Sequence, residues 1–140
     1  MTHILYSICD SQGLSLEQVL ANKNLYYRTF SLRKPNGKFR PIDAPFGALI
    51  QAQKLCLGYL SGGQYDIHEA AKAFRQGVSL QANAEPHRSQ RRLLQIDLKD
   101  FFGSIKSPMI EPIFGPVVTD LVTFRGRLPQ GAPTSPIVSN

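Results

Sequence analysis

The sequence lacks any hydrophobic run long enough to cross a membrane. No stretch approaches the roughly 20 apolar residues that a membrane-spanning helix needs. The first residues, MTHILYSICDSQG, also lack the basic leader, long apolar core and small-residue cleavage site of a secretory signal. These absences exclude the common classes of membrane and exported protein, and we expect a cytoplasmic chain without a membrane partner.

Cysteine is scarce as well. The two cysteines, Cys9 and Cys56, form no CxxC pair, and both lie among apolar residues at helical spacing. This pattern favours small core residues over a redox or metal role, although the pattern alone leaves both open. A chain of 140 residues can bury about two thirds of its unfolded surface. The sequence therefore predicts one domain that needs neither a disulfide nor a metal to fold.

Acidic residues are few and thinly spread, whereas basic residues gather in clusters. The chain has 16 Lys and Arg against 10 Asp and Glu, a net charge of +6. The basic clusters lie in 32–40, 87–92 and 124–127. Such an excess favours a polyanionic partner such as nucleic acid, although many basic proteins bind none. Three clusters of this kind could converge on one groove.

Hydrophobic periodicity predicts a mixture of helices and strands, with no internal repeat and no regular βαβ alternation. Helices are expected over 2–9, from Ser15 with a Ser15 and Gln18 capping box, over 48–60 with an end at Gly62 and Gly63, and over 68–74. Strands are expected over 26–32 and 38–42, as a hairpin around Pro-Asn-Gly, and over 93–98 and 120–124, the last followed by a turn at 125–127. We therefore expect an α+β fold.

One carboxylate stands out in LLQIDLKDFFGSI, residues 93–105. In the expected strand, Leu94, Ile96 and Leu98 share one face and Asp97 lies on the other. A carboxylate at the end of a buried strand is costly unless it is paired or binds a cation. The partner of Asp97 is therefore either a nearby Arg or Lys or a hard cation such as Mg²⁺, which prefers carboxylate oxygens.

Four segments of the chain together resemble a known family. FSLRKPNGKFRPIDAP, HEAAKAFRQGVSLQANAEPH, LLQIDLKDFFGSI and GRLPQGAPTSPIVSN occur in this order. They resemble bacterial reverse transcriptases of the retron and group II intron type, particularly those of retrons, from about Tyr26 to Asn140. The resemblance implies an RNA-directed DNA polymerase that uses magnesium. It also implies an α+β arrangement of fingers and partial palm of a right-hand polymerase, with an N-terminal helical segment (1–25), fingers with a basic hairpin (26–92) and a truncated partial palm (93–140).

The resemblance implies roles for residues around the nucleotide. Asp97 matches the first catalytic aspartate, which binds two Mg²⁺ ions with help from the carbonyl of Leu98. Phe102 matches an aromatic gate against the 2′-hydroxyl, although plain core packing is the alternative. The other matched positions are basic fingers residues, two residues whose amides approach the triphosphate, and a glutamine beside the sugar: Arg33, Lys38, Arg40, Asp100, Phe101 and Gln130. A charged hairpin tip is otherwise usually only a solvated surface.

A loop within the expected fingers segment resembles the family's template-contacting segment. Its positions include cations that could meet backbone phosphate, a contact that is blind to sequence. The residues are Arg75, Gly77, Ser79, Asn83, His87, Arg88, Arg91 and Arg92. The implied partners are an RNA template, a DNA primer and deoxynucleoside triphosphates, and the retron resemblance implies a role in phage defence.

The match departs from the family in two places. The family's second carboxylate pair, in a Y/F-x-D-D hairpin, belongs downstream of SPIVSN, and the 140 residues contain no such motif. The interval 103–127 is also shorter than we expect for a retron-like enzyme. We therefore expect an N-terminal fragment that is catalytically inactive alone, with exposed strand edges that favour self-association. The alternatives are a nucleic-acid-binding relic and an interaction module that completes a palm with a partner chain carrying the missing aspartates.

Overall fold

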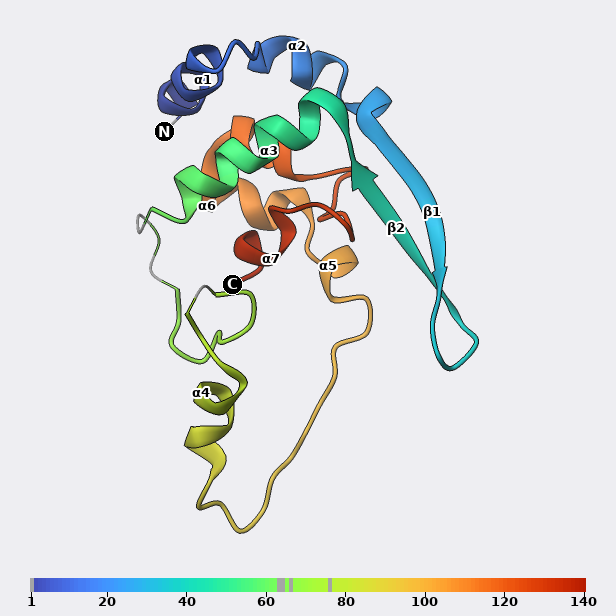
Figure 1. Cartoon of the computed structure of the whole chain (residues 1–140), viewed down its shortest axis with the longest axis vertical. Coiled ribbons are helices and arrows are strands. Elements are labelled where there is room, and N and C mark those ends of the chain that lie inside the picture. The colour runs from blue at the N-terminus through green and yellow to red at the C-terminus, as the bar shows by residue number, and fades with distance from the viewer. Residues whose placement is uncertain (1, 63–64, 66, 76) are drawn as a thin grey trace.

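The computed structural model of the chain describes residues 2–62, 65, 67–75 and 77–140 and combines helices with a single hairpin (Figure 1). The elements in chain order are α1 (Thr2–Ser11), α2 (Leu16–Ala21), the 3₁₀ helix η1 (Lys23–Tyr26), β1 (Tyr27–Arg33), β2 (Phe39–Pro45), α3 (Gly47–Leu60), α4 (Leu80–Ala84), the 3₁₀ helix η2 (Glu85–His87), α5 (Phe101–Ser104), α6 (Ser107–Val122) and α7 (Ser135–Val138). The expected mixture of α and β structure is confirmed. The further assignment to fingers and palm, with its segment boundaries, stays a prediction. Within the described part of the chain, no helix has both the length and the hydrophobicity to span a bilayer.

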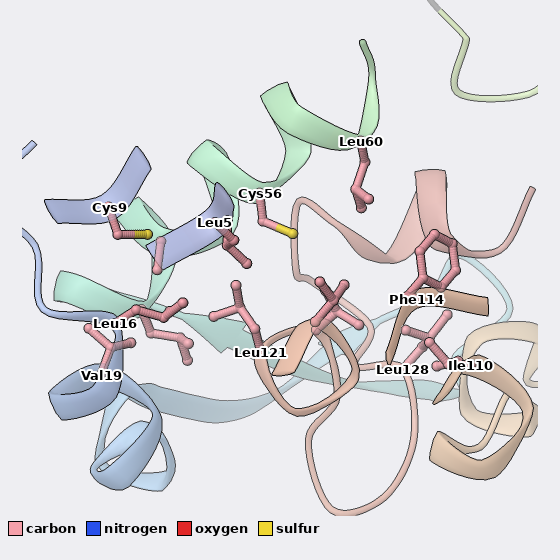
Figure 2. Packing of buried hydrophobic residues seen from close by; sticks show 14 residues of the cluster. Leu5, Cys9, Leu16, Val19, Cys56, Leu60, Ile110, Phe114, Leu121 and Leu128 are labelled. Carbon is pink, nitrogen blue, oxygen red and sulfur yellow. The ribbon is translucent and has the colours of Figure 1, made fainter. Parts of the chain in front are cut away.

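The hydrophobic core lies between α1, α2, α3 and α6 at one end of the molecule (Figures 1 and 2). Each helix presents apolar residues three or four positions apart to this core, as amphipathic helices do. The buried set is Leu5, Cys9, Leu16, Val19, Leu49, Ala52, Cys56, Leu60, Ile110, Phe114, Val118, Leu121, Val122 and Leu128. The expected core placement of Cys9 and Cys56 is confirmed, since both are free and fully buried. Burial raises the pKa of the Cys56 thiol to about 12.

Local sequence signals set the first two helices as expected. The Ser15 hydroxyl accepts a hydrogen bond from the Gln18 amide at 3.4 Å and thereby caps the N-terminus of α2. Lys23, in η1, donates to the Asp120 carboxylate and, at 2.8 Å, to the Asp120 carbonyl near the end of α6. A cation at this end of a helix interacts favourably with the helix dipole. The Lys23 contact therefore ties the N-terminal helices to α6.

The hairpin forms where the Pro-Asn-Gly turn predicts it. The Lys34 amide donates to the Lys38 carbonyl at 2.7 Å, and Gly37 has a φ of +77° inside the turn. β1 and β2 pair antiparallel from Tyr27 opposite Pro45 to Arg33 opposite Phe39. The hairpin therefore extends from the body of the molecule with its turn at the free end (Figure 1).

The base of the hairpin is fixed to the helical core. The Tyr27 ring stacks on Phe124 with centroids 4.0 Å apart, and its hydroxyl accepts a hydrogen bond from Gln53 at 3.1 Å. The same Gln53 amide donates to the Leu121 carbonyl at 3.0 Å. Burial raises the pKa of Tyr27 to about 12. Gln53 thus links β1, α3 and α6 at one buried point.

The expected strand over 120–124 is wrong, because its first residues complete α6. Leu121 and Val122 are fully buried as the last helical turn, at helical spacing from Phe114 and Val118. Packing against the core here overrides the β preference of a Leu-Val-Thr-Phe run. Pro116 is accommodated by a kink at the preceding residue, Gly115, which has non-helical angles of φ 77° and ψ 169°.

Two further secondary-structure predictions are wrong, whereas the predicted turn is confirmed. Residues 68–74 form turns and irregular backbone instead of a helix, and residues 93–98 form no strand. A strand needs a neighbour for its backbone groups, and the described residues place none beside 93–98. The turn at 125–127 is confirmed by paired hydrogen bonds between Phe124 and Arg127 at 2.9 and 3.2 Å. Of the two glycines expected to end α3, Gly63 lies outside the described residues.

Candidate functional site

Three segments that are distant in sequence meet at the base of the hairpin. The Asp43 amide of β2 donates to the Gln130 carbonyl at 2.9 Å, and the Leu128 amide donates to the Ile105 carbonyl at 3.0 Å. These bonds join β2 to the loop 128–131 and that loop to the end of α5. We call this meeting point of residues 42–43, 101–105 and 128–131 the junction. It brings the DFFGSI and LPQG motifs together, as a shared site requires.

Gly131 allows the loop 128–131 to lie directly on β2. Its φ of +127° falls in a region that only glycine adopts readily. A Cβ at this position would lie 2.8 Å from the Ile42 Cγ2 and 3.2 Å from the Asp43 carbonyl oxygen. On the other side of the loop, the buried Ser135 hydroxyl donates to the Pro129 carbonyl at 2.7 Å. The position of Gln130 is therefore set by the contacts of its loop with β2 and with Ser135.

Asp43 is a part of the junction that the sequence analysis missed. Asp43 is only 6% exposed. Its carboxylate accepts a hydrogen bond at 2.7 Å from the hydroxyl of Thr29, the residue opposite Asp43 in β1. A buried carboxylate without such a bond would be strongly unfavourable. The sequence feature that could have pointed to Asp43 is an acidic residue within the otherwise apolar run PIDAP.

Residues 100–103 form a compact aromatic corner at the start of α5. Asp100 adopts a left-handed φ of +51° before the helix, and a Cβ at Gly103 would overlap both carboxylate oxygens of Asp100. The rings of Phe101 and Phe102 have centroids 5.5 Å apart, and Phe102 lies 6.3 Å from Phe74. Phe101 is more exposed, whereas Phe102 is half-buried against the core. Phe102 therefore has a packing role, and its predicted gate role remains a prediction.

The basic hairpin residues are exposed and lie toward the turn, apart from the junction. Strand register puts Arg40 opposite Leu32 and Arg33 opposite Phe39, so the two arginines belong to opposite faces of the ribbon. Both nevertheless border a hollow of about 380 Å³ at the turn. Among the described residues, neither arginine nor Lys38 forms an ion pair. Their charges are therefore available to an anionic ligand.

The predicted template-contacting residues lie around α4, at the end of the molecule opposite α1 and α2 (Figure 1). Two of them contact neighbouring residues: Ser79 caps α4 by accepting from the Ala82 amide at 3.1 Å, and the exposed Arg88 lies 3.5 Å from the Glu85 carboxylate. Arg75 is half-buried and donates to the Ala71 carbonyl at 3.3 Å. The remaining members are exposed: Gly77, Asn83, His87, Arg91 and Arg92.

The three basic clusters do not converge on one groove, so that prediction is wrong. The hairpin cluster lies toward the turn, the cluster at 87–92 lies beyond α4, and 124–127 follows α6 beside the junction (Figure 1). The arrangement follows from the long irregular path between α4 and α5, which separates the second cluster from the rest of the chain. Any polyanion that touches all three must therefore extend along the molecule.

Asp97 and Leu98 lie on that irregular path and are exposed to solvent. The residues that the structure describes contain no group of three or more His, Cys, Asp or Glu that could hold a metal ion. Two metal ions about 4 Å apart need several carboxylates between them. Asp97 by itself therefore does not fit the two-magnesium centre that the family resemblance implies.

Sequence comparison finds relatives among curated retron proteins. The chain is 29% identical to "Retron Mx162 reverse transcriptase" of Myxococcus xanthus, over 82% of this chain and 29% of the relative. It is 28% identical to "Retron Ec86 reverse transcriptase" of Escherichia coli, over 90% of this chain and 42% of the relative. It is 30% identical to "Retron Mx65 reverse transcriptase" of Myxococcus xanthus, over 82% of this chain and 33% of the relative. No family model matches the chain.

These relatives confirm the resemblance to retron-type reverse transcriptases that the four motifs predicted. The chain spans between 29% and 42% of the length of these curated relatives. The match with the Mx162 protein extends over 142 positions but covers only 82% of this 140-residue chain, which is about 115 residues. The relative therefore carries residues within the match that have no counterpart in this chain.

Proposed function

We propose that this chain, which is related in sequence to retron reverse transcriptases over most of its length, is the nucleotide-binding and template-binding part of an RNA-directed DNA polymerase. The observation that carries the proposal is the junction. β2, the DFFGSI segment and the LPQG loop are far apart in sequence, yet backbone hydrogen bonds of 2.9 and 3.0 Å join them. These segments belong to three of the four motifs that resemble the family.

The junction offers the chemistry that a deoxynucleotide requires. The Gln130 side chain would lie beside the sugar, since hydrogen bonds from the Asp43 amide and the Ser135 hydroxyl hold its loop in place. The Phe102 ring, half-buried and held against Phe101, would restrict the space available to a 2′-hydroxyl. The backbone amides of Asp100 and Phe101 would approach the triphosphate.

The exposed basic residues of the hairpin would bind the triphosphate. Arginine is suited to this role because its planar guanidinium donates two parallel hydrogen bonds to phosphate oxygens. Arg33 and Arg40 border one hollow at the turn, and Lys38 lies in the same segment. A ligand in that hollow would contact both arginines even though they belong to opposite faces of the ribbon.

The residues around α4 would contact an RNA template and a DNA primer. Exposed cations bind phosphate without reading sequence, which suits a polymerase that must copy any template. Arg88, Arg91 and Arg92 are the exposed arginines in this segment. The retron relationship further suggests a cytoplasmic role in phage defence.

Asp97 and the Leu98 carbonyl would belong to a magnesium site that further carboxylates complete. Oxygen ligands are the ones that Mg²⁺ prefers. Because the described residues contain no group of three or more His, Cys, Asp or Glu that could hold a metal ion, we propose that these 140 residues do not polymerise by themselves.

RNA affinity at several salt concentrations tests the proposal. We expect single-stranded RNA, followed by fluorescence anisotropy, to bind the chain with an affinity that falls steeply between 50 and 200 mM salt, because phosphate contacts release counterions. Replacing both Arg91 and Arg92 by glutamine removes two of the proposed template contacts and should reduce the log–log slope by roughly 1.4.

The control is Arg125→Gln, which removes an exposed arginine outside the hairpin and the α4 segment. It should leave the slope almost unchanged. A salt-independent affinity, or an equal loss in the control and the double variant, would contradict the proposed phosphate contacts.

A further inference from the structure

Two cations lie directly opposite each other beside the junction. Lys106 and Arg127 form an isolated antiparallel bridge. The bridge is flanked by two backbone hydrogen bonds of 3.0 Å, one donated by the Ser107 amide and one by the Leu128 amide. In a bridge that is flanked in this way, the opposed side chains share a face and the Cα atoms lie only about 4.5 Å apart. The backbone therefore holds Lys106 and Arg127 as close neighbours.

Within the described part of the chain, neither cation of this pair is neutralised by an acidic side chain. The Lys106 ammonium donates to the Gly103 carbonyl at 2.7 Å, which fixes its position and leaves two of its three donors for other partners. The Asp100 carboxylate also lies beside Gly103, yet it forms no ion pair with Lys106. Arg127 is half-buried. Because like charges directly opposite each other are unfavourable, the pair is complementary to an anion.

Arg125, from the same basic cluster, has a different environment. It has a φ of +52° and is followed by Gly126 with +72°, as a two-residue hairpin turn requires at both central positions. The Arg125 guanidinium carbon lies 4.8 Å from the centroid of the Phe124 ring, so this cation already has an aromatic partner. Of the two arginines in the turn, Arg127 is the one that the backbone places opposite Lys106.

We propose that Lys106 and Arg127 bind a phosphate monoester or free phosphate, that is, a phosphate group with two negative charges. The planar guanidinium donates two parallel hydrogen bonds to two phosphate oxygens, and the ammonium contacts a third as a point charge. A dianion neutralises both cations, whereas a phosphodiester carries one charge and neutralises only one. The site lies at the rim of the junction, since Lys106 follows 101–105 and Arg127 precedes 128–131.

The inference goes beyond the proposed function, because it requires neither the hairpin arginines nor the residues around α4. Those residues are proposed to contact a triphosphate and the internal phosphates of a template. A chain that binds phosphate at Lys106 and Arg127 but does not bind RNA would support the site and contradict the proposed function. A chain that binds RNA with a 5′-hydroxyl end, but shows no phosphate binding at this pair, would do the reverse.

A titration with inorganic phosphate at constant ionic strength, followed by amide chemical shifts, tests the site. We expect saturable shifts of the Ser107 and Leu128 amides, which flank the pair. Arg127→Gln and Lys106→Gln should each weaken phosphate binding by roughly tenfold or more, because each removes a charge-assisted hydrogen bond. Arg125→Gln is the matched control from the same turn and should leave binding unchanged. The absence of saturable shifts, or equal losses in Arg125→Gln and Arg127→Gln, would overturn the proposal.

Stability measurements separate a binding role of Arg127 from a structural one. In phosphate-free buffer, Arg127→Gln should unfold at the same urea concentration as the wild type or at a higher one, because the substitution removes a like-charge repulsion. Added phosphate should raise the unfolding midpoint of the wild type but not that of Arg127→Gln, since a ligand stabilises only the state that binds it. A variant that is destabilised without phosphate, yet gains as much from phosphate as the wild type, would overturn the proposal.

A comparison of ligands tests the charge and identifies the source of the phosphate. Deoxyadenosine 5′-monophosphate, a dianion, should bind more tightly than dimethyl phosphate, a monoanion, and equal affinities would overturn the dianion site. Two oligonucleotides of one sequence, with a 5′-phosphate or a 5′-hydroxyl, distinguish a strand end from free phosphate. A preference for the phosphorylated strand that Arg127→Gln abolishes would support the site and identify a strand end as its ligand. Equal binding of the two strands, with Arg127-dependent binding of inorganic phosphate, would support the site and identify free phosphate.

Discussion

Gly131→Ala should destabilise the fold through the junction. The native φ of +127° is open in practice only to glycine, and an alanine held there costs about 1–3 kcal/mol. The new methyl group would also lie 2.8 Å from the Ile42 Cγ2, and overpacking of this kind costs about 1–3 kcal/mol more. We therefore expect the free energy of unfolding to fall by about 2–6 kcal/mol.

Gly126→Ala provides the matched control in the same part of the chain. Gly126 also has a positive φ, +72°, but nothing lies within 4 Å of the position of its Cβ. The change should cost only the left-handed backbone penalty of about 1–2 kcal/mol. Urea unfolding followed by circular dichroism would give both values from the shift in midpoint at an unchanged slope.

Hydrogen exchange would locate the effect of Gly131→Ala. The Asp43 amide donates to the Gln130 carbonyl at 2.9 Å, so displacement of the loop 128–131 should reduce the protection of that amide. Gly126→Ala should leave the protection of the Asp43 amide, measured relative to global stability, unchanged. Equal destabilisation by the two variants, with Asp43 equally protected in both, would refute the close contact between this loop and β2.

Two further outcomes follow from the buried thiol and the proposed metal ligand. Burial raises the pKa of Cys56 from its usual 9.0 to about 12, so the unfolded chain loses this proton first and stability should fall by about 1.4 kcal/mol by pH 10. Thermal unfolding of Cys56→Ala should show a correspondingly weaker decline above pH 9, and an identical decline would contradict the assignment. In a primer-extension assay with an RNA template, Mg²⁺ and deoxynucleotides, the chain alone should yield no product. Extension that survives Asp97→Asn would show that Asp97 is not the metal ligand.

Local chemistry made some elements predictable. The hairpin follows from Pro-Asn-Gly, since the turn residues determine the backbone within a few positions. The cap at Ser15 is similarly local. α6 was not predictable in this way, because Pro112 and Pro116 suggest interruption and the run after Asp120 suggests a strand, whereas packing against α3 and the kink at Gly115 decide the outcome.

The predicted strand at 93–98 shows the limit of periodicity. Alternation identifies a segment that can pair, but the partner is a property of the rest of the structure. The site residues within DFFGSI and LPQG were found through their resemblance to a family. The role of Asp43 depends on contacts with Thr29 and Gln130, which sequence spacing does not reveal.

Residue-resolved mapping of RNA on the chain would test most directly whether its basic segments bind a nucleic-acid template. In a titration of isotopically labelled protein with short single-stranded RNA, followed by amide chemical shifts, we expect the largest changes around α4, in residues 79–83 and 87–92. Arg125 and the helices α1 and α3 should change little. Shifts confined to the helical core, or none at RNA concentrations that saturate the anisotropy signal, would contradict template binding by these segments.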